Sequence, residues 1–140
     1  MSRQHHTKNK GDIGCLKVQV KMAELGFTIL IPLSEHEVFD FVAYKDGDFK
    51  KVQAKYRSIE NGSLTVPFKT AWADKNGSHI NYIDKTEIDI IAVYCPETDK
   101  VYFVNPTDYE NSTSLNLRVE QTKNNQRKGI LFAENFLSVP

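Results

Sequence analysis

The stretch from Val38 to Tyr56 constrains the fold of this chain more than any other segment. It is typical of two strands joined by a tight turn, because Lys45–Asp48 contains a glycine that accepts positive φ and aspartates that bond their own backbone. The second strand alternates, so Gln53 and Lys55 point to one face. If Asp40 points there too, a carboxylate, an amide oxygen and an ammonium meet, which suits a divalent metal and a phosphate. A hydrogen-bonded turn aspartate beside solvated lysines is the alternative interpretation.

The length of the chain, 140 residues, is sufficient for one domain with a single core. We expect a flexible tail over residues 1–9 and one α/β domain over residues 10–140. The formal net charge is zero, which is not typical of a strongly basic nucleic-acid-binding protein. Basic residues nevertheless gather in 1–21 and 118–128, and acidic residues in 84–110. This pattern fits one basic face and one acidic face, and it fits ordinary scatter of surface charge equally well.

The two cysteines, Cys15 and Cys95, provide no disulfide framework. Neither a signal peptide nor an apolar run of transmembrane length is present, so we expect a cytoplasmic protein with no membrane partner. His5 and His6 could bind a metal, but adjacent histidines in a mobile tail are better interpreted as incidental.

The order of elements expected along the chain is a helix, several strands and a closing helix. Two adjacent apolar stripes at helical spacing predict a broadly buried helix over Lys10–Leu25, which Gly26 ends. The turn Asp74–Gly77 predicts the tip of a hairpin that projects from the core. We expect further strands over Phe27–Pro32, Val38–Tyr44, Phe49–Tyr56, Ser63–Phe68, Glu87–Tyr94, Lys100–Val104 and Leu115–Val119, and the closing helix over Gly129–Leu137. This order indicates an α/β fold in which helices flank a mixed sheet.

The ordered set of segments resembles the PD-(D/E)xK nuclease superfamily. The segments that carry this resemblance are KGDIG at residues 10–14, FTILIP at 27–32, Asp40, and QAK at 53–55. Within the superfamily, the glutamine of the QxK motif, the segment Ile88–Pro106 and the tail Asn124–Gln126 are similar to bacterial group I intron-encoded homing endonucleases. The resemblance extends over residues 10–137 and implies a restriction-endonuclease-like mixed β-sheet.

The resemblance also implies a role for each residue of the motif. Asp40 would be the metal-ligating carboxylate, and the Ala54 backbone carbonyl a further ligand. Gln53 would occupy a ligand position at which most relatives have Glu or Asp. Lys55 would stabilise the attacking hydroxide or the phosphate. Hard oxygen ligands favour Mg²⁺, which lowers the pKa of a bound water and neutralises charge on the scissile phosphate.

One position departs from the pattern that the resemblance implies. Such nucleases usually have Glu directly after the KGDIG-like phrase, and here that residue is Cys15. A thiol is a poor ligand for Mg²⁺, so Asp40 would be the only carboxylate at the metal. One interpretation is that Cys15, whether natural or introduced, impairs cleavage. The other is that Asp12 or Glu24 compensates for the missing carboxylate.

The function that the resemblance implies is Mg²⁺-dependent cleavage of double-stranded DNA at an intron insertion site, in a bacterial cytoplasm. Cutting both strands with one site per chain requires a homo-oligomer, a dimer or a tetramer. The apolar strands near residues 88–104 could form its interface or the core. Candidate DNA contacts are basic and polar side chains outside the motif, namely Lys8, Lys10, Arg57, Lys69, Lys75, Asn76, Ser78, Arg118, Arg127 and Lys128.

Three other functions remain open on the sequence. A Holliday-junction resolvase would share the fold and read branched shape. A DNA-binding protein with an inactive nuclease core would fit Cys15. An interaction domain that binds no nucleic acid would fit the zero net charge, and a steep fall of DNA affinity with salt would exclude it.

Overall fold

The computed structural model describes residues 6–122, 124 and 127–140, so His5 and part of the Asn124–Gln126 tail lie outside the described residues. The elements follow one another as α1 (His6–Glu24), β1 (Thr28–Leu30), β2 (Phe41–Lys45), β3 (Asp48–Tyr56), β4 (Ser63–Pro67), β5 (Lys69–Asp74), β6 (Gly77–Tyr82), β7 (Ile90–Cys95), β8 (Lys100–Val104), the 3₁₀ helix η1 (Pro106–Tyr109), β9 (Ser114–Arg118), β10 (Leu131–Phe132) and the 3₁₀ helix η2 (Ala133–Phe136).

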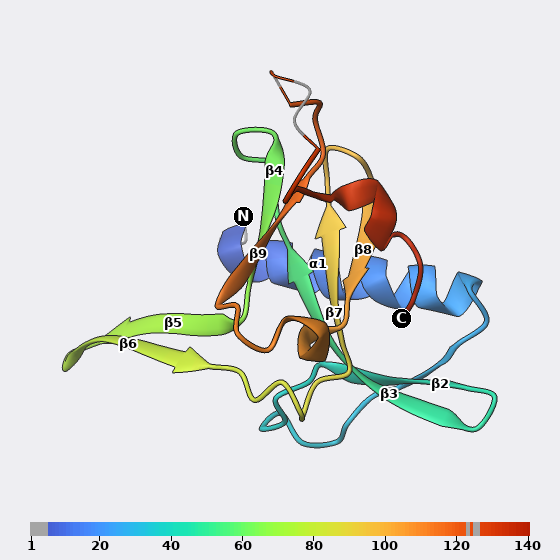
Figure 1. Cartoon of the computed structure of the whole chain (residues 1–140). Coiled ribbons are helices and arrows are strands. Elements are labelled where there is room, and N and C mark those ends of the chain that lie inside the picture. The colour runs from blue at the N-terminus through green and yellow to red at the C-terminus, as the bar shows by residue number, and fades with distance from the viewer. Residues whose placement is uncertain (1–5, 123, 125–126) are drawn as a thin grey trace, which may run out of the picture.

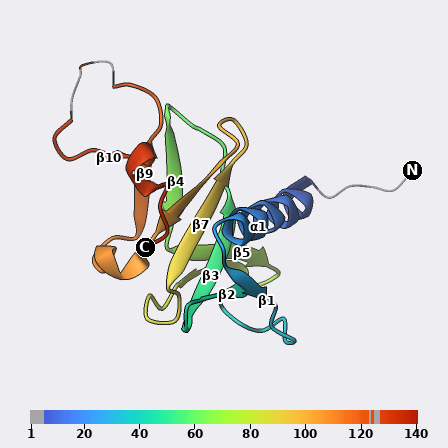
Figure 2. The ribbon, with the colours of Figure 1, turned by 90° about the vertical axis from the view of Figure 1, so that its right-hand side faces the viewer.

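The described elements form three layers around a five-stranded sheet with the order β1-β2-β3-β7-β8. Strands β3 and β7 are parallel, and the other neighbours in this sheet are antiparallel. Helix α1 crosses one face of the sheet (Figure 1), and the smaller sheet β10-β9-β4 covers the other face (Figure 2). The expected mixed α/β fold is confirmed.

Two apolar clusters, one on each face of the central sheet, hold the layers together. On the side of α1, Val18 and Met22 pack with Val52 of β3. On the other side, Ile91 of β7 packs with Leu117 of β9. Every residue of β7 is buried, as expected for a strand covered on both faces. The strands near residues 88–104 therefore belong to the core of their own chain.

Helix α1 differs from the sequence prediction in its start and in its burial. It begins at His6, so the expected flexible tail is helical from that residue onward. Val18 and Met22 are fully buried, but Leu16 and Val20 are 60% and 56% exposed. The prediction of a broadly buried helix was wrong because the sheet covers only one side of α1 (Figure 2). Neither α1 nor another helix in the described ranges is long and apolar enough to cross a membrane.

The projecting hairpin is confirmed as an independent two-stranded sheet. Strands β5 and β6 pair from Lys69 opposite Tyr82 to Asp74 opposite Gly77. The hairpin extends well away from the layered core (Figure 1). A two-stranded ribbon is at best marginally stable alone in water, so its position depends on how its two ends are held.

The closing helix predicted over Gly129–Leu137 was wrong. Leu131 of β10 pairs in parallel with Leu117 of β9, and a single 3₁₀ turn follows. Ala133 is buried in the core shared with β9. A segment of this length nucleates a helix poorly, so strand pairing and burial decide its conformation. A sheet therefore covers the face on which a second helix was expected.

Candidate active site

Asp40 lies directly before β2, although the sequence placed it inside a strand over Val38–Tyr44. Strand β2 begins at Phe41, opposite Val52, so β3 continues beyond the end of its neighbour. Asp40 occupies this end. Its N–H donates to the Val52 carbonyl over 2.8 Å, and its Oδ2 accepts from the Ala54 N–H over 2.7 Å. We call this place, bounded by Asp40 and Ala54, the notch.

Gln53 shares one face of β3 with Lys55, because the alternate residue Ala54 faces the cluster under α1. The Gln53 Nε2 donates to the Val38 carbonyl over 3.2 Å and so ties down the segment that leads into Asp40. Its Oε1 is buried and has no hydrogen-bond partner among the described residues. A buried acceptor without a donor is costly, so this oxygen suits a cation or an incoming donor.

Burial shifts the pKa values of two ionisable groups, Lys55 and Asp40. The pKa of Lys55 is lowered to about 8, mainly by burial and also by the charge of Arg57, while Asp40 opposes the shift. Asp40 is open to solvent on one side, but the protein packed around its carboxyl raises its pKa, against the Ala54 N–H and Lys55. The ammonium is thus poorly solvated, and an entering anion such as a phosphate would stabilise it.

The close packing of α1 on β3 depends on Gly14. A Cβ on Gly14 would lie 3.0 Å from Cβ of Tyr56 and 3.4 Å from the carbonyl carbon of Lys55. Glycine permits this approach because it has no side chain. The helix therefore reaches the strand that carries the QxK motif at the residue before Cys15.

Cys15 lies beside the notch as a neutral thiol. Burial and the charges of Asp40 and Asp12 raise its pKa, and a hydrogen bond from Gln19 Nε2 to Sγ, 3.4 Å long, opposes the shift. Glu24 ends α1, about 13 Å further along the helix axis. The alternative in which Glu24 replaces the missing carboxylate was therefore wrong, whereas Asp12 is close enough to act on Cys15.

The oxygen atoms near the notch suit a hard divalent cation, which they would bind with modest affinity. The N–H and C=O of one residue in a strand point to the same edge, so the Ala54 carbonyl faces the notch, as its N–H does. Together with the Asp40 carboxylate and the orphan Gln53 Oε1 it offers the hard ligands that Mg²⁺ prefers. Only one of the three is charged, and the described residues contain no group of three or more His, Cys, Asp or Glu that could hold a metal ion.

The comparisons with known proteins agree with this geometry. The sequence model of the PD-(D/E)XK endonuclease family matches residues 5–139. The chain belongs to the PD-(D/E)XK endonuclease family. Its fold is similar to that of a solved bacterial homing endonuclease, I-Ssp6803I, with a TM-score of 0.71 and 22% identity over 87% of this chain and 83% of that chain. No curated protein sequence shows a significant match.

Two groups of the predicted DNA-binding residues of this PD-(D/E)XK endonuclease are accessible. Lys10 and Arg57 line one hollow of about 350 Å³ at the end of β3, and burial lowers the pKa of Arg57. Lys8 is exposed in the first turns of α1. The second group lies on the hairpin and comprises Lys69 at its base and Lys75, Asn76 and Ser78 at its tip, all of them exposed.

The remaining candidates lie near β9 and β10. The guanidinium of Arg118 donates to the backbone carbonyls of Asn61, Glu120 and Gln121 at 2.8–3.1 Å. These bonds hold the surrounding turns, so they compete with any DNA contact by Arg118. Arg127 lies over the Phe132 ring, 5.5 Å from its centre, and Lys128 is exposed.

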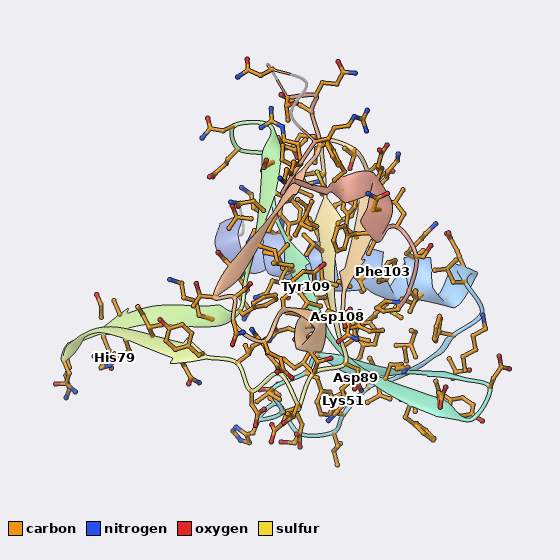
Figure 3. All side chains as sticks on the ribbon, in the orientation of Figure 1. Lys51, His79, Asp89, Phe103, Asp108 and Tyr109 are labelled. Carbon is orange, nitrogen blue, oxygen red and sulfur yellow. The ribbon has the colours of Figure 1, made fainter. Side chains whose placement is uncertain are left out.

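Asp89 supports β3, the strand that carries the QxK motif, and the sequence analysis did not identify it. Its Oδ2 accepts from the Lys51 N–H over 2.8 Å, and its N–H donates to the Lys51 carbonyl over 2.9 Å. Figure 3 shows the two residues side by side. The pair extends the contact between β3 and the start of β7, next to Gln53. The feature of the sequence that could have identified Asp89 is an acidic residue directly before the wholly apolar strand β7.

Proposed function

We propose that this PD-(D/E)XK endonuclease is a site-specific, Mg²⁺-dependent DNA endonuclease that makes a double-strand break at an intron insertion site. The observation that carries the proposal is the Asp40 carboxylate, which is held by the Ala54 N–H and is close enough to Lys55 to affect its pKa. Lys55 lies on the strand that also carries the orphan Gln53 Oε1. The homing assignment rests on the QxK motif and on the likeness in fold to a bacterial homing endonuclease.

The residues of the notch divide the chemistry between them. A divalent cation supplies Lewis-acid charge that activates a water and neutralises the phosphate. Asp40, Gln53 Oε1 and the Ala54 carbonyl would hold it, and the Ala54 N–H keeps the carboxylate in place. The Lys55 ammonium, whose pKa burial lowers to about 8, binds a phosphate oxygen and stabilises the negative charge of the transition state.

The thiol of Cys15 supports a second candidate function, a DNA-binding protein that cleaves poorly. Its pKa is raised by burial and by Asp40, so it brings no negative charge to the cation. With a neutral amide at Gln53 as well, the donor set carries a single carboxylate, and weak cation binding follows.

DNA engagement is assigned to the side of the molecule that carries the hairpin. A two-stranded ribbon fits the major groove of B-DNA, and Lys75, Asn76 and Ser78 at its tip have donors for base edges. Lys10 and Arg57, which share one hollow beside β3, would contact phosphates and set the register. The first turns of α1 and the hairpin lie on the same side in Figure 1.

Two copies of the chain are required for a double-strand break, because each has one notch. The strands β7 and β8, which the sequence offered as an interface, are buried within their own chain apart from Lys100. A contact between copies must therefore use another surface. We propose a homodimer or homotetramer, which equilibrium sedimentation with and without DNA would establish.

The decisive experiment measures Mg²⁺-dependent cleavage of linear DNA that contains candidate intron insertion sites, in parallel with a four-way junction. Both the chain with Cys15 and its Cys15→Glu variant are used. Cleavage at one linear site, mainly by Cys15→Glu, supports a homing endonuclease that Cys15 impairs. Cleavage of the junction alone indicates a resolvase. Salt-sensitive binding without cleavage by either form indicates the DNA-binding protein.

A further inference from the structure

Lys85 belongs to the segment between β6 and β7, and its ammonium is turned toward the protein. Nζ donates to the backbone carbonyls of Tyr109, of Glu110 over 3.0 Å and of Ser112 over 2.7 Å. It also lies 4.5 Å from the centre of the Phe68 ring. An ammonium has three N–H donors, and three carbonyls accept from this one. Lys85 therefore adds to the positive charge of the sequence without offering a donor to DNA.

The loop that receives Lys85 also holds the base of the hairpin. The N–H of Phe68, directly before β5, donates to the carbonyl of Thr113 over 3.0 Å. The N–H of Ile83, directly after β6, donates to the carbonyl of Phe68 over 3.0 Å. The Phe68 side chain is only 1% exposed, so this foot is anchored in the core. Both ends of the hairpin thus depend on residues 109–113.

The segment between β6 and β7, which contains Lys85, also connects the hairpin to β3. Asp89 exchanges two hydrogen bonds with the backbone of Lys51 on β3, two residues before Gln53. Figure 3 shows Lys51 and Asp89 together and His79 far out on the hairpin. Between the hairpin and β3, the segment is therefore fastened at Lys85 and again at Asp89.

We propose that Lys85 is a positioning residue, whose ammonium locks hairpin β5–β6 at one angle to β3. That angle sets which base pairs the hairpin reads relative to the phosphate at the notch, so Lys85 determines sequence discrimination without touching DNA. The inference rests on the proposed DNA-binding function. Its physical basis is that an isolated ribbon lacks rigidity of its own, whereas base readout requires side chains to be held in place by supporting contacts.

The test compares Lys85→Met with Lys75→Met, a matched change at the exposed hairpin tip. The probes are one duplex that the wild type selects from a randomised pool and a scrambled duplex of the same composition, without divalent cations. Lys85→Met should weaken binding to the selected duplex about tenfold, leave the scrambled duplex unaffected and keep the salt dependence of the wild type. Lys75→Met should weaken both and reduce the slope of log affinity against log salt by about 0.9.

A charge-conserving variant separates the two roles further. If residue 85 contacted phosphate, Lys85→Arg would be tolerated because it keeps the charge. The three carbonyls around Lys85, however, converge on one nitrogen, which suits a compact ammonium and not the longer, planar guanidinium. We therefore expect Lys85→Arg to lose discrimination as Lys85→Met does. Binding of the selected duplex by Lys85→Arg at wild-type strength would overturn the proposal, as would a fall in the salt slope of Lys85→Met equal to that of Lys75→Met.

Hydrogen exchange of the DNA-free protein tests the same lock independently of DNA. Lys85→Met should speed exchange of the amides of Phe68 and Ile83, while amides of the core strand β7 keep their protection. If the wild type shows no salt-dependent DNA binding, the proposed function fails. Hydrogen exchange alone then tests whether Lys85 fixes the hairpin. Unchanged exchange at Phe68 and Ile83 overturns it in either case, and loss of protection in β7 as well would assign Lys85 to global stability instead.

Discussion

The backbone N–H of Ala54 donates to Oδ2 of Asp40 over 2.7 Å, at the point where β2 ends and β3 continues. The carboxylate thereby takes the place of a β2 residue that the sheet lacks. It is held against the strand that carries Gln53 and Lys55, so sheet geometry, rather than a flexible loop, positions the candidate catalytic groups.

The first prediction concerns the charge of Asp40. Asp40→Asn retains an oxygen that can accept from the Ala54 N–H but loses the carboxylate charge at this position. In the Cys15→Glu background we expect cleavage to fall about a hundredfold, or about 2.7 kcal/mol of barrier, with DNA affinity maintained. Single-turnover cleavage and equilibrium binding measure the two quantities. The exposed Asp48→Asn, at the turn between β2 and β3, is the control, and an equal loss in that variant would contradict the role of Asp40.

The second prediction concerns Cys15. Cys15→Glu places a carboxylate beside Asp40 and should raise Mg²⁺-dependent cleavage by about tenfold or more, which requires about 1.4 kcal/mol. Titration of the rate with Mg²⁺ should also show tighter cation binding. Cys15→Ser, which adds no charge, should leave the rate near that of the wild type. An unchanged rate in Cys15→Glu would show that this position does not serve the cation.

The third prediction concerns the contact between α1 and β3. Gly14→Ala puts a Cβ 3.0 Å from Cβ of Tyr56, and overpacking of this kind costs about 1–3 kcal/mol of unfolding free energy. Gly11→Ala is the matched control on the same helix, because no atom lies within 4 Å of its Cβ position. It should stabilise the protein by about 0.5–1 kcal/mol. Urea unfolding measures both, and equal effects would contradict the close approach.

The fourth prediction concerns pH. The folded state lowers the pKa of Lys55 from its ordinary 10.5 to about 8, so between these values the unfolded chain binds a proton that the folded chain does not. Stability contributed by this group therefore rises with pH from about 8 to about 10.5. Below pH 8 the buried charge is unfavourable, and Lys55→Met should stabilise the fold at pH 7 by on the order of 1–3 kcal/mol.

Thermal unfolding of Lys55→Met across this range checks the sign. Its melting temperature should exceed that of the wild type by several degrees at pH 7, and the difference should shrink as pH rises above 8. Cleavage should be lost in the same variant. The exposed Lys75→Met should show no such pH-dependent difference, and a destabilised Lys55→Met at pH 7 would contradict the burial of the ammonium.

Local patterns were sufficient to predict the motif and the hairpin. Alternation along β3 places Gln53 and Lys55 on one face, and the turn residues Asp74–Gly77 end a hairpin. Both features follow from neighbouring residues. The apolar stripe of Leu16 and Val20 was misinterpreted as core, because its burial depends on whether another element covers that side of α1. The closing helix was mispredicted because pairing of β10 with β9 outweighs a short helical pattern.

By itself, the sequence determined the family and the mixed α/β class and singled out Asp40, Gln53 and Lys55 as candidates, because strand alternation, turn chemistry and the QxK motif are local properties. Only the tertiary structure decided where Asp40 lies relative to Ala54 and which basic side chains remain accessible. The carbonyls that bind Lys85 and Arg118 come largely from segments distant in sequence. A basic side chain becomes internal or accessible according to where the folded backbone places its acceptors, and no local pattern encodes that placement.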